Sequence, residues 1–438
     1  MSQPSSGRRP HVVIIGGGFG GVAAAQTLKR APVDVTVIDR TNHHLFQPLL
    51  YQVATAVLAP SDITVPIRWL LRKQKNTTVL MGEVQEVDPD RRVVYFDEER
   101  REIAYDFLIL AAGARHSYFG HNEWEEYAPG LKSIEDALEI RRRFLLAFEE
   151  AEKTDDAAQR EALQTFVIVG GGPTGVELAG IIPATARDAM HDDFRRIDTR
   201  DTRVILLEGG PRVLPTFPQD LSDHARNDLK ELGVEVRTNA LVTRIEDDAV
   251  YVGEERIPAR TVFWGAGNAA SPLSRSLGAP LDRAGRVEVA RDLSVPGHPE
   301  LFVVGDLALY MQDGKPVPGV AQAAMQQGAQ AAQNILHTLR GEPRGEFVYR
   351  DKGDLATIGR NKAVGSFRRG RLRIAGRTAW WLWLFVHIMY LAGFRNRVSV
   401  FIQWAYAYFT YQRGVRLITG DVRRTARPVA AGQSIKGW

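Results

Sequence analysis

Two glycine-rich stretches stand where the chain can hold phosphate groups. Residues 16–21 read GGGFGG and residues 170–175 read GGGPTG. Each follows a run of four apolar residues, 12–15 and 166–169, and each leads into a segment typical of a helix. A strand that turns sharply on glycines into a helix brings backbone N–H groups to a phosphate. The two stretches therefore predict two dinucleotide sites in one chain.

The first stretch belongs to a complete dinucleotide-binding βαβ unit over residues 11–40. Gly16, Gly18 and Gly21 fit G-x-G-x-x-G, in which the first glycine permits the turn, the second admits pyrophosphate and the third lets helix pack on strand. Asp39 ends the second strand, where its carboxylate can accept hydrogen bonds from ribose hydroxyls. The alternative is a glycine-rich turn in an ordinary α/β domain.

The second stretch repeats this arrangement with Gly170, Gly172 and Gly175, and its following strand ends at Glu208. A carboxylate at this place favours a free 2′-hydroxyl and repels a 2′-phosphate, so the second site is expected to prefer NADH over NADPH. Arg212 lies close enough in sequence to weaken that preference.

Three more apolar strands end in small residues. Residues 105–120 and 260–273 look like paired crossover segments, one closing each nucleotide domain. A later strand at 301–308 puts Asp306 directly after a glycine. The alternative role for Asp306 is a turn or helix cap.

Length and charge set limits on the function. The 438 residues suit two or three domains. The net charge is only +4, but from residue 361 onward 14 Lys and Arg face one acid, Asp421. An acidic body with a basic, aromatic tail indicates contact with anionic headgroups or nucleic acid. Residues 1–10 are polar and contain no stretch suited to a signal sequence, so we expect no export.

The aromatic tail predicts two interfacial helices. Residues 379–393 would form a helix of roughly 22 Å, too short to span a hydrocarbon core of about 30 Å. A second aromatic run covers 398–411, and arginines flank both runs at positions 395, 397, 413 and 416. The alternative is a buried dimer interface, and the two can hold together. Nucleic-acid binding is disfavoured because the arginines flank nearly continuous apolar runs and no nucleic-acid module is recognised. His387 is interpreted as a packed histidine, with no metal site expected.

The order of these elements resembles the flavoproteins with two dinucleotide-binding domains. Within that group, residues 46–68, 319–335 and 381–410 are similar to bacterial type II NADH:quinone oxidoreductases. The resemblance implies an α/β fold with two Rossmann-like, glutathione-reductase-like domains and a C-terminal amphipathic helical membrane-anchoring segment. Disulfide reductases, sulfide:quinone oxidoreductases and cysteine-dependent NADH oxidases and peroxidases each need a redox cysteine near the flavin. The chain has no cysteine, which excludes those chemistries.

The expected division of the chain follows from this resemblance. It comprises an FAD-binding domain in two parts (1–118 and 291–345), a helical connector (119–160), an NADH-binding domain (161–290) and a membrane-associating region (346–438). The charges of the helical segment 133–164 are expected to mark a solvated face.

The resemblance also assigns residues to the two cofactors. The FAD residues are Gly16, Gly18, Gly21, Asp39, Ala112, Gly113, Asp306, Ala321 and Gln322. The NADH residues are Gly170, Gly172, Gly175, Glu177, Glu208 and Gly267. Hydride passes from nicotinamide to flavin by positioning alone, without an acid or base. Glu177 is expected to orient the nicotinamide or carry protons; the alternative is an acid that complements the dipole of its helix.

Gln322 and Gln326 lie four residues apart and therefore on one helix face. In the family this pattern lines the quinone site, opposite the nicotinamide. A glutamine amide can donate to a quinone carbonyl and accept from a quinol hydroxyl. The helix start, at residues 318–320, is expected to direct partial positive charge at the flavin. Pro48 and Tyr51 are assigned to the flavin and quinone wall by resemblance, the alternative being packed core.

The predicted protein is a homodimeric, monotopic flavoenzyme of respiratory electron transport at the cytoplasmic face of the cell inner membrane. It oxidises NADH and passes two electrons to a membrane quinone without pumping protons. The sequence leaves ubiquinone and menaquinone open. The rival hypotheses are an NAD(P)H-dependent reductase of a soluble acceptor and a membrane-docked redox sensor.

Overall fold

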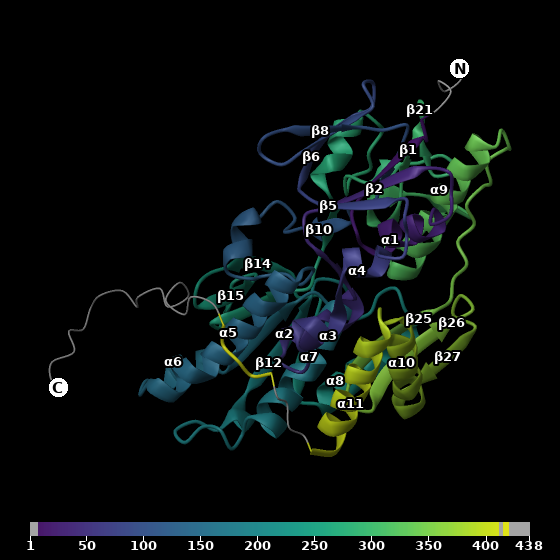
Figure 1. The fold of residues 1–438 in the computed structure, drawn as a ribbon. Coiled ribbons are helices and arrows are strands. Elements are labelled where there is room, and N and C mark those ends of the chain that lie inside the picture. The colour runs from purple at the N-terminus through teal and green to yellow at the C-terminus, as the bar shows by residue number, and fades with distance from the viewer. Residues whose placement is uncertain (1–7, 411–414, 420–438) are drawn as a thin grey trace.

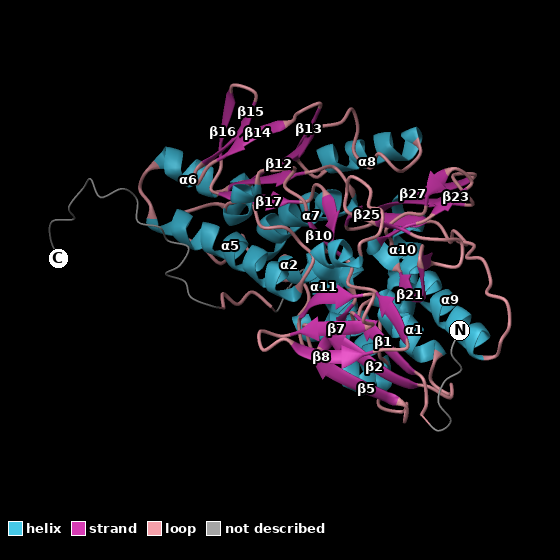
Figure 2. Ribbon diagram, turned by 90° about the horizontal axis from the view of Figure 1, so that it is seen from above, coloured by secondary structure: helices cyan, strands magenta, loops and turns pink. Residues whose placement is uncertain are grey.

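The computed structural model describes residues 8–410 and 415–419 (Figure 1). The predictions that concern residues 1–7, Arg413 and Asp421 fall outside the described residues. The two predicted nucleotide domains contain separate parallel sheets, which Figure 2 shows in the lower and upper halves of the molecule.

The first sheet has six strands in the order β20-β21-β9-β1-β2-β5. They are β1 (His11–Ile15), β2 (Asp34–Asp39), β5 (Thr77–Met81), β9 (Phe107–Leu110), β20 (Ser294–Val295) and β21 (His298–Val303), of which only the edge strand β20 pairs antiparallel. Helices α1 (Phe19–Thr27) and α9 (Ala321–Leu339) pack against each other beside this sheet (Figure 1). The β1 and β9 strands are apolar and almost fully buried, as expected for a sheet covered on both faces.

The second sheet has four parallel strands in the order β13-β12-β11-β17. They are β11 (Thr165–Val169), β12 (Arg203–Glu208), β13 (Val234–Thr238) and β17 (Thr261–Trp264). Helices α5 (Ile134–Lys153), α7 (Pro173–Ala184) and α8 (Gln219–Glu231) share its hydrophobic core.

The prediction that the charges of the connector mark a solvated face is wrong for part of α5. Phe144 and Phe148 of this helix pack on Phe166 of β11, with ring centroids 5.3 and 5.5 Å apart. The same packing buries Arg141, whose guanidinium donates to the carbonyls of Val53 and Leu58. Arg142 is buried as well. A helix that looks amphipathic and highly charged is therefore part of the core.

Each domain carries a small antiparallel sheet, and one further strand pair joins the two domains. Strands β6 (Val84–Asp88), β7 (Val93–Phe96) and β8 (Arg101–Ala104) precede β9, and β14 (Val242–Ile245), β15 (Ala249–Val252) and β16 (Glu255–Pro258) precede β17. Strand β10 (Ala114–His116) pairs with β18 (Asn268–Ala270), so the two predicted crossover segments contact each other directly. The remaining short elements are β3 (His43–Leu45), α2 (Leu50–Ala54), α3 (Pro60–Ile63), β4 (Thr64–Pro66), α4 (Ile67–Leu71), α6 (Ala157–Leu163), β19 (Val287–Glu288), β22 (Ala308–Leu309), β23 (Met311–Gln312) and β24 (Lys315–Pro316).

The C-terminal part begins with an antiparallel sheet of β25 (Asp354–Gly359), β26 (Lys362–Phe367) and β27 (Leu372–Ala375). Helices α10 (Gly376–Tyr390) and α11 (Phe394–Thr410) follow, close to the two runs predicted from the sequence. Strand β25 packs directly on α7, because a Cβ at Gly180 would lie 1.6 Å from the carbonyl oxygen of Ile358. In the described ranges no helix has the length and apolarity needed to cross a membrane.

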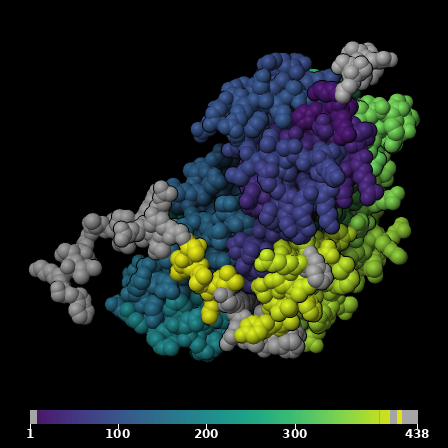
Figure 3. Space-filling model, viewed as in Figure 1, coloured from purple at the N-terminus to yellow at the C-terminus, as the bar shows by residue number. Residues whose placement is uncertain are grey.

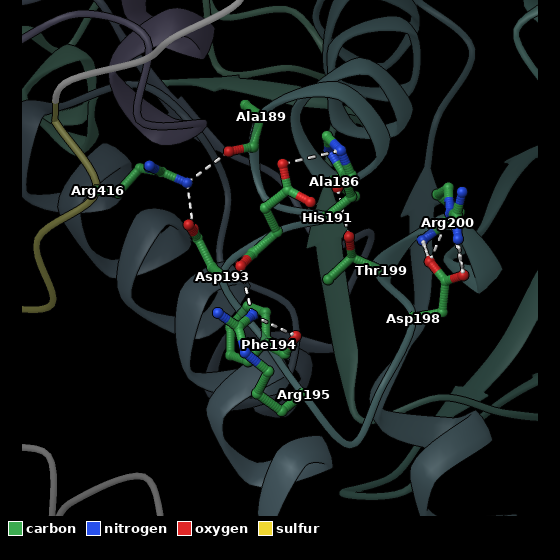
Figure 4. Close-up of polar contacts among 11 residues, drawn as sticks. Ala186, Ala189, His191, Asp193, Phe194, Arg195, Asp198, Thr199, Arg200 and Arg416 are labelled. Atoms are coloured by element: carbon green, nitrogen blue, oxygen red, sulfur yellow. Dashed lines mark hydrogen bonds and ion pairs between the residues drawn. The ribbon is translucent and has the colours of Figure 1, made fainter.

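Residues 415–419 return from α11 to the second domain. Arg416 donates to the carbonyl of Ala189 (2.5 Å) and forms an ion pair with Asp193, in the loop that follows α7 (Figure 4). The expectation that Arg416 faces lipid headgroups is therefore wrong, because an acidic side chain of the same chain neutralises it. Arg397 also turns inward and donates to the carbonyl of Leu391, whereas Arg395 is exposed.

Candidate functional site

One large cavity of about 1670 Å³ joins both nucleotide domains and the C-terminal part. It is bordered by the first glycine loop (16–20), three strand ends (111–116, 264–268 and 304–306), the starts of α7 and α9, residues 352–355 and the end of α10. The carboxyl ends of parallel strands are the usual ligand side of such sheets. The cavity therefore lies where the two predicted dinucleotides would meet.

The first glycine loop has the geometry of a pyrophosphate cradle. Gly16 has a φ of +100°, and a Cβ there would lie 2.4 Å from the carbonyl oxygen of Ala111. A Cβ at Gly21 would lie 1.8 Å from the Gly16 carbonyl, so α1 packs on the loop without a side chain between them. Gly18 caps α1 and faces open space, which leaves room for a phosphate. The loop fits a dinucleotide such as FAD.

Asp39 stands beside this loop at the end of β2. Its carboxylate accepts hydrogen bonds from the backbone N–H groups of Gly17 (2.5 Å) and Thr41 (2.7 Å). Asp39 lines the cavity, and both contacts fix the carboxylate at its edge. The predicted Ala112, Gly113, Asp306, Ala321 and Gln322 also line the cavity.

The cavity wall near Asp306 contains a cation that the sequence analysis missed. Lys132 lies between Leu131 and the N-cap of α5, and its side chain borders the cavity. Burial lowers the pKa of its ammonium group, while the negative charges of Asp306 and Asp136 act in the opposite direction. No motif surrounds Lys132 in the sequence, and only the fold brings it to Asp306.

The second glycine loop repeats the first. Gly170 has a φ of +107°, and a Cβ at Gly175 would lie 1.9 Å from the Gly170 carbonyl. Gly172 faces open space at the start of α7. These three glycines and Glu208 lie outside the lining of the large cavity, whereas Pro173, Thr174, Glu177 and Gly267 belong to it.

Glu208 is placed like Asp39. Its carboxylate accepts from the backbone N–H groups of Gly171 (2.5 Å) and Gly210 (2.6 Å). The guanidinium of Arg212 donates instead to the carbonyls of Phe217 (2.8 Å) and Pro215 (2.7 Å). The guanidinium of Arg212 is thus bound by its own loop and not by Glu208.

Glu177 is one of the carboxyl groups that line the cavity. It projects from α7 into the cavity and is half-buried beneath β25. Burial raises the pKa of Glu177 well above its ordinary value, and a hydrogen bond from the backbone of Thr357 opposes this only in part. The close contact of α7 with β25 explains the exclusion of water. A carboxyl group of this kind keeps its proton to a higher pH than a carboxyl group in water does.

The two predicted glutamines bind protein backbone. Gln322 donates to the carbonyl of Gly353 (3.0 Å) and accepts from the N–H of Lys352 (3.1 Å). Gln326 makes the same pair of bonds with both backbone groups of Arg350, at 3.1 and 3.0 Å. Gln322 lines the cavity, but Gln326 does not, so the structure does not bring Gln326 to the predicted quinone site. Its amide instead ties α9 to the chain that leads into β25.

The structure places the two residues assigned to the flavin and quinone wall differently. Pro48 lines the cavity. Tyr51 is only 4% exposed and points into the core of α2 and α5, where its hydroxyl accepts from the Gln52 amide (2.9 Å). Tyr51 lies outside the cavity lining because it is one turn further along, on the packed side of α2.

His387 of α10 borders the same end of the cavity. Its ring stacks on Trp383 with centroids 4.3 Å apart, and its Nδ1–H donates to the Trp383 carbonyl (2.7 Å). Burial lowers the pKa of His387 to about 4, so the ring is neutral at physiological pH. Among the described residues no group of three potential metal ligands is found.

Comparisons with known proteins agree with this arrangement. The pyridine nucleotide-disulphide oxidoreductase family matches residues 10–328, and the NDH2 C-terminal domain matches residues 352–411. A type II NADH:quinone oxidoreductase of Mycobacterium tuberculosis is 45% identical, with 96% of this chain and 92% of the relative covered. A type II NADH:quinone oxidoreductase of Haemophilus influenzae is 30% identical, with 89% and 95% covered.

Two solved structures share the fold at low identity. NDH2 from Plasmodium falciparum in complex with NADH has a TM-score of 0.85 and 22% identity, covering 93% of this chain and 100% of that one. The sulfide:quinone oxidoreductase from Aquifex aeolicus has a TM-score of 0.70 and 20% identity, covering 91% and 95%. The two glycine loops, the shared cavity and the identity of nearly half with mycobacterial relatives lead to one conclusion: the chain belongs to the type II NADH:quinone oxidoreductases, within the pyridine nucleotide-disulphide oxidoreductase family.

Proposed function

We propose that the chain oxidises NADH at the α7 end of the cavity and reduces a membrane quinone at the α10 end, without pumping protons. NADH oxidation and quinone reduction are the activity of its family. The proposed geometry rests on one observation: a single cavity is lined by the first glycine loop, by Glu177 and by His387. A nucleotide donor and an apolar acceptor can therefore reach a common space from opposite domains.

FAD, when bound, supplies the chemistry that accepts a hydride from NADH and gives two electrons to quinone. The first glycine loop would bind its pyrophosphate and Asp39 its ribose, while Asp306 and the start of α9 would hold the part nearer the ring. Helix α9 begins at Ala321, and no side chain caps its Val320 N-cap, so unpaired backbone N–H groups remain at this end. They provide partial positive charge beside the bound cofactor.

At the NADH end, Gly172 and Glu208 would bind the adenosine half. Gly267 and Glu177 lie in the cavity lining, where the nicotinamide must be oriented for transfer. We assign selection against NADPH to Glu208, because its carboxylate would repel a 2′-phosphate. The position of Arg212 supports this assignment, since its guanidinium is bound to Phe217 and Pro215.

At the quinone end, Gln322 retains a capacity to bind. Its amide has two N–H groups, and the bond to Gly353 uses one of them. We propose that the other donates to a quinone carbonyl between Pro48 and the end of α10. Gln326 holds the chain at Arg350 and acts on quinone only through that support.

Protons for the quinol require a group that can hold one near the cavity. Glu177 has the raised pKa that this task needs, and it lies in the same lining as Gln322. We propose that Glu177 holds a proton at the cavity and exchanges it during turnover.

We further propose that α10 and α11 dock in one leaflet at the cytoplasmic face of the cell inner membrane. Their exposed apolar side chains include Trp381, Phe385, Met389, Val398, Phe401 and Ile402. The α10 residues recur every four positions and share one face, as in an interfacial helix. The alternative occupant of this surface is a second copy of the chain; a homodimer that uses another surface is compatible with docking.

Steady-state NADH oxidation tests the function directly. Rapid turnover with a short-chain quinone is expected, with FAD bleaching by NADH and recovery on quinone addition. Turnover with dyes but not with quinones would favour a reductase of a soluble acceptor. Binding without turnover would favour a redox sensor.

A further inference from the structure

The short helix α4 of the first domain presents a large aromatic side chain and several cations to solvent. Trp69 is 47% exposed. Four cations surround it in the sequence and are all exposed: Arg68, Arg72, Lys73 and Lys75. In the described part of the chain, none of the four has a carboxylate within ion-pair distance. By contrast, the exposed Arg200, Arg244 and Arg256 of the second domain each pair with an acid. The four cations near Trp69 thus form a positive patch.

The exposure of Trp69 is fixed by how α4 packs. Ile67 and Leu71 are buried in the hydrophobic core of the first domain, and their burial holds α4 in one orientation. The opposite side must then carry Trp69 outward. The guanidinium of Arg72 lies over the indole ring, 3.8 Å from its centroid, and donates to the Trp69 carbonyl. The aromatic ring and its cation are thus presented together.

This patch continues the exposed surface of α10 and α11. A Cβ at Gly393, in the turn between these helices, would lie 4.0 Å from the Trp69 ring and 3.7 Å from Val65. Asn396 of α11 donates to the carbonyl of Thr64, three residues before α4 (3.0 Å). In Figure 3 the yellow C-terminal helices adjoin the violet-to-blue first domain on one face of the molecule.

We propose that α4 and residues 72–75 form a second membrane contact, which binds the headgroups of anionic phospholipids while Trp69 enters the interface. The proposal rests on the docking of α10 and α11 described above and adds a lipid preference to it. Tryptophan beside Arg and Lys is the composition typical of a headgroup region. Long Lys and Arg stems can cover apolar surface while their charges stay in water.

The charge distribution explains why the patch belongs to α4 rather than to the aromatic helices. Arg397 and Arg416 are bound to other parts of the chain, as described above. Arg377 and Arg395 are exposed cations on α10 and α11, but the other exposed side chains there are mostly apolar, and apolar contact does not distinguish neutral from anionic lipid. The four cations near Trp69 supply that distinction, and each contributes roughly a five-fold factor in binding near an anionic surface.

Flotation of the full chain with vesicles of phosphatidylcholine, alone or mixed with phosphatidylglycerol, tests the proposal. We expect tighter binding to the anionic vesicles and loss of that preference in high salt. The variant Arg68→Gln/Arg72→Gln/Lys73→Gln/Lys75→Gln should bind anionic vesicles on the order of 600-fold more weakly. Its binding to neutral vesicles should stay unchanged. FAD content and NADH-to-dye activity report whether the variant is folded.

A matched control removes four exposed cations elsewhere: Lys230→Gln/Arg275→Gln/Arg283→Gln/Lys315→Gln. It should keep the preference for anionic vesicles. An equal loss in the control would show that only net charge matters and would overturn the proposal.

Trp69→Ser should weaken binding to both kinds of vesicle several-fold. If the wild type floats equally on both kinds, the α4 contact is refuted while docking by α10 and α11 stands. If it floats on neither, the docking proposal itself fails. If the quadruple variant loses DNA binding but keeps its lipid preference, the patch serves nucleic acid instead.

Discussion

A hydrogen bond from the backbone of Thr357 joins β25 to the carboxyl group of Glu177 on α7. The two residues are 180 positions apart, and their contact places an acid of the second domain beneath the C-terminal sheet. Burial there favours the protonated carboxyl group. The folded protein therefore binds a proton at Glu177 in a pH range where the unfolded chain has lost it.

The first prediction concerns stability against pH. Because the pKa of Glu177 is higher in the folded than in the unfolded chain, its destabilising effect is absent below the ordinary pKa and grows as pH rises toward the folded value. Each unit of difference corresponds to about 1.4 kcal/mol. Glu177→Gln should remove this slope, so that the variant gains in Tm relative to wild type as pH rises. Parallel Tm curves for the two proteins between pH 5 and pH 9 would show that the carboxyl group is not the source.

Cofactor selection is predicted to depend on Glu208. Glu208→Gln removes the negative charge that repels a 2′-phosphate and should narrow the NADH to NADPH ratio in kcat/KM by roughly ten-fold, or ~1.4 kcal/mol. Asp39→Asn is the matched control, since Asp39 makes the same contacts beside the other loop. It should weaken FAD retention and leave the nucleotide ratio unchanged. Equal use of both nucleotides by the wild type would contradict the assignment.

Quinone reduction is predicted to separate Gln322 from Gln326. Gln322→Leu should leave anaerobic bleaching of FAD by NADH nearly intact and slow reoxidation by quinone about ten-fold, which matches the loss of one hydrogen bond. Gln326→Leu breaks an equivalent tie to the backbone but lies outside the cavity lining. If both variants slow reoxidation equally in stopped-flow measurements, the ties to residues 350–353 matter and direct contact with quinone does not.

Membrane docking is predicted to depend on the exposed faces of α10 and α11. Phe385→Ser/Phe401→Ser should reduce flotation on neutral vesicles strongly, because each large apolar side chain contributes about 1.5–3 kcal/mol when fully buried. Phe119→Ser/Met311→Ser is a suitable control. Phe119 lies in the crossover segment 105–120 and is 69% exposed, and Met311 lies in β23 and is 53% exposed. High salt should release the wild type only in part, and detergent should release it fully. Complete release by salt alone would argue against apolar docking.

Truncation before Thr378 would test membrane docking less cleanly than surface substitutions do. Helix α10 carries Trp383, which is 3% exposed, and His387, which borders the cavity. Removal of α10 would expose the hydrophobic core and open the cavity, in addition to removing the exposed apolar face. Single surface variants therefore test docking better than deletion.

The parts of the site that sequence could predict are those set by local pattern. Gly16, Gly18 and Asp39 belong to one continuous βαβ unit, so their spacing alone indicates the turn and the strand end. Their repetition at Gly170 and Glu208 predicts the second domain in the same way. The short aromatic runs likewise predicted two helices whose ends lie within four residues of those of α10 and α11.

What sequence could not predict depends on contacts between distant segments. Tyr51 is buried in α2 and bonded to the Gln52 amide, and Gln326 binds the backbone at Arg350 instead of lining the cavity. Arg141 carries the signature of a solvated residue, yet it donates to carbonyls 83 and 88 positions earlier. A hydrophobic pattern gives no sign of such bonds, since a buried cation and an exposed one look alike in the chain.

The contact between Gly180 and Ile358 has a consequence for mutation far from any ligand. A methyl group at position 180 would act as a wedge, because it cannot share the space taken by the Ile358 carbonyl. Separation of the C-terminal sheet from α7 would let water reach Glu177 and lower its pKa toward that of a free carboxyl group. The lack of a side chain at Gly180 thus keeps water out between α7 and β25. Substitutions at this position are expected to leave the nucleotide site intact while Glu177 loses its proton at a lower pH.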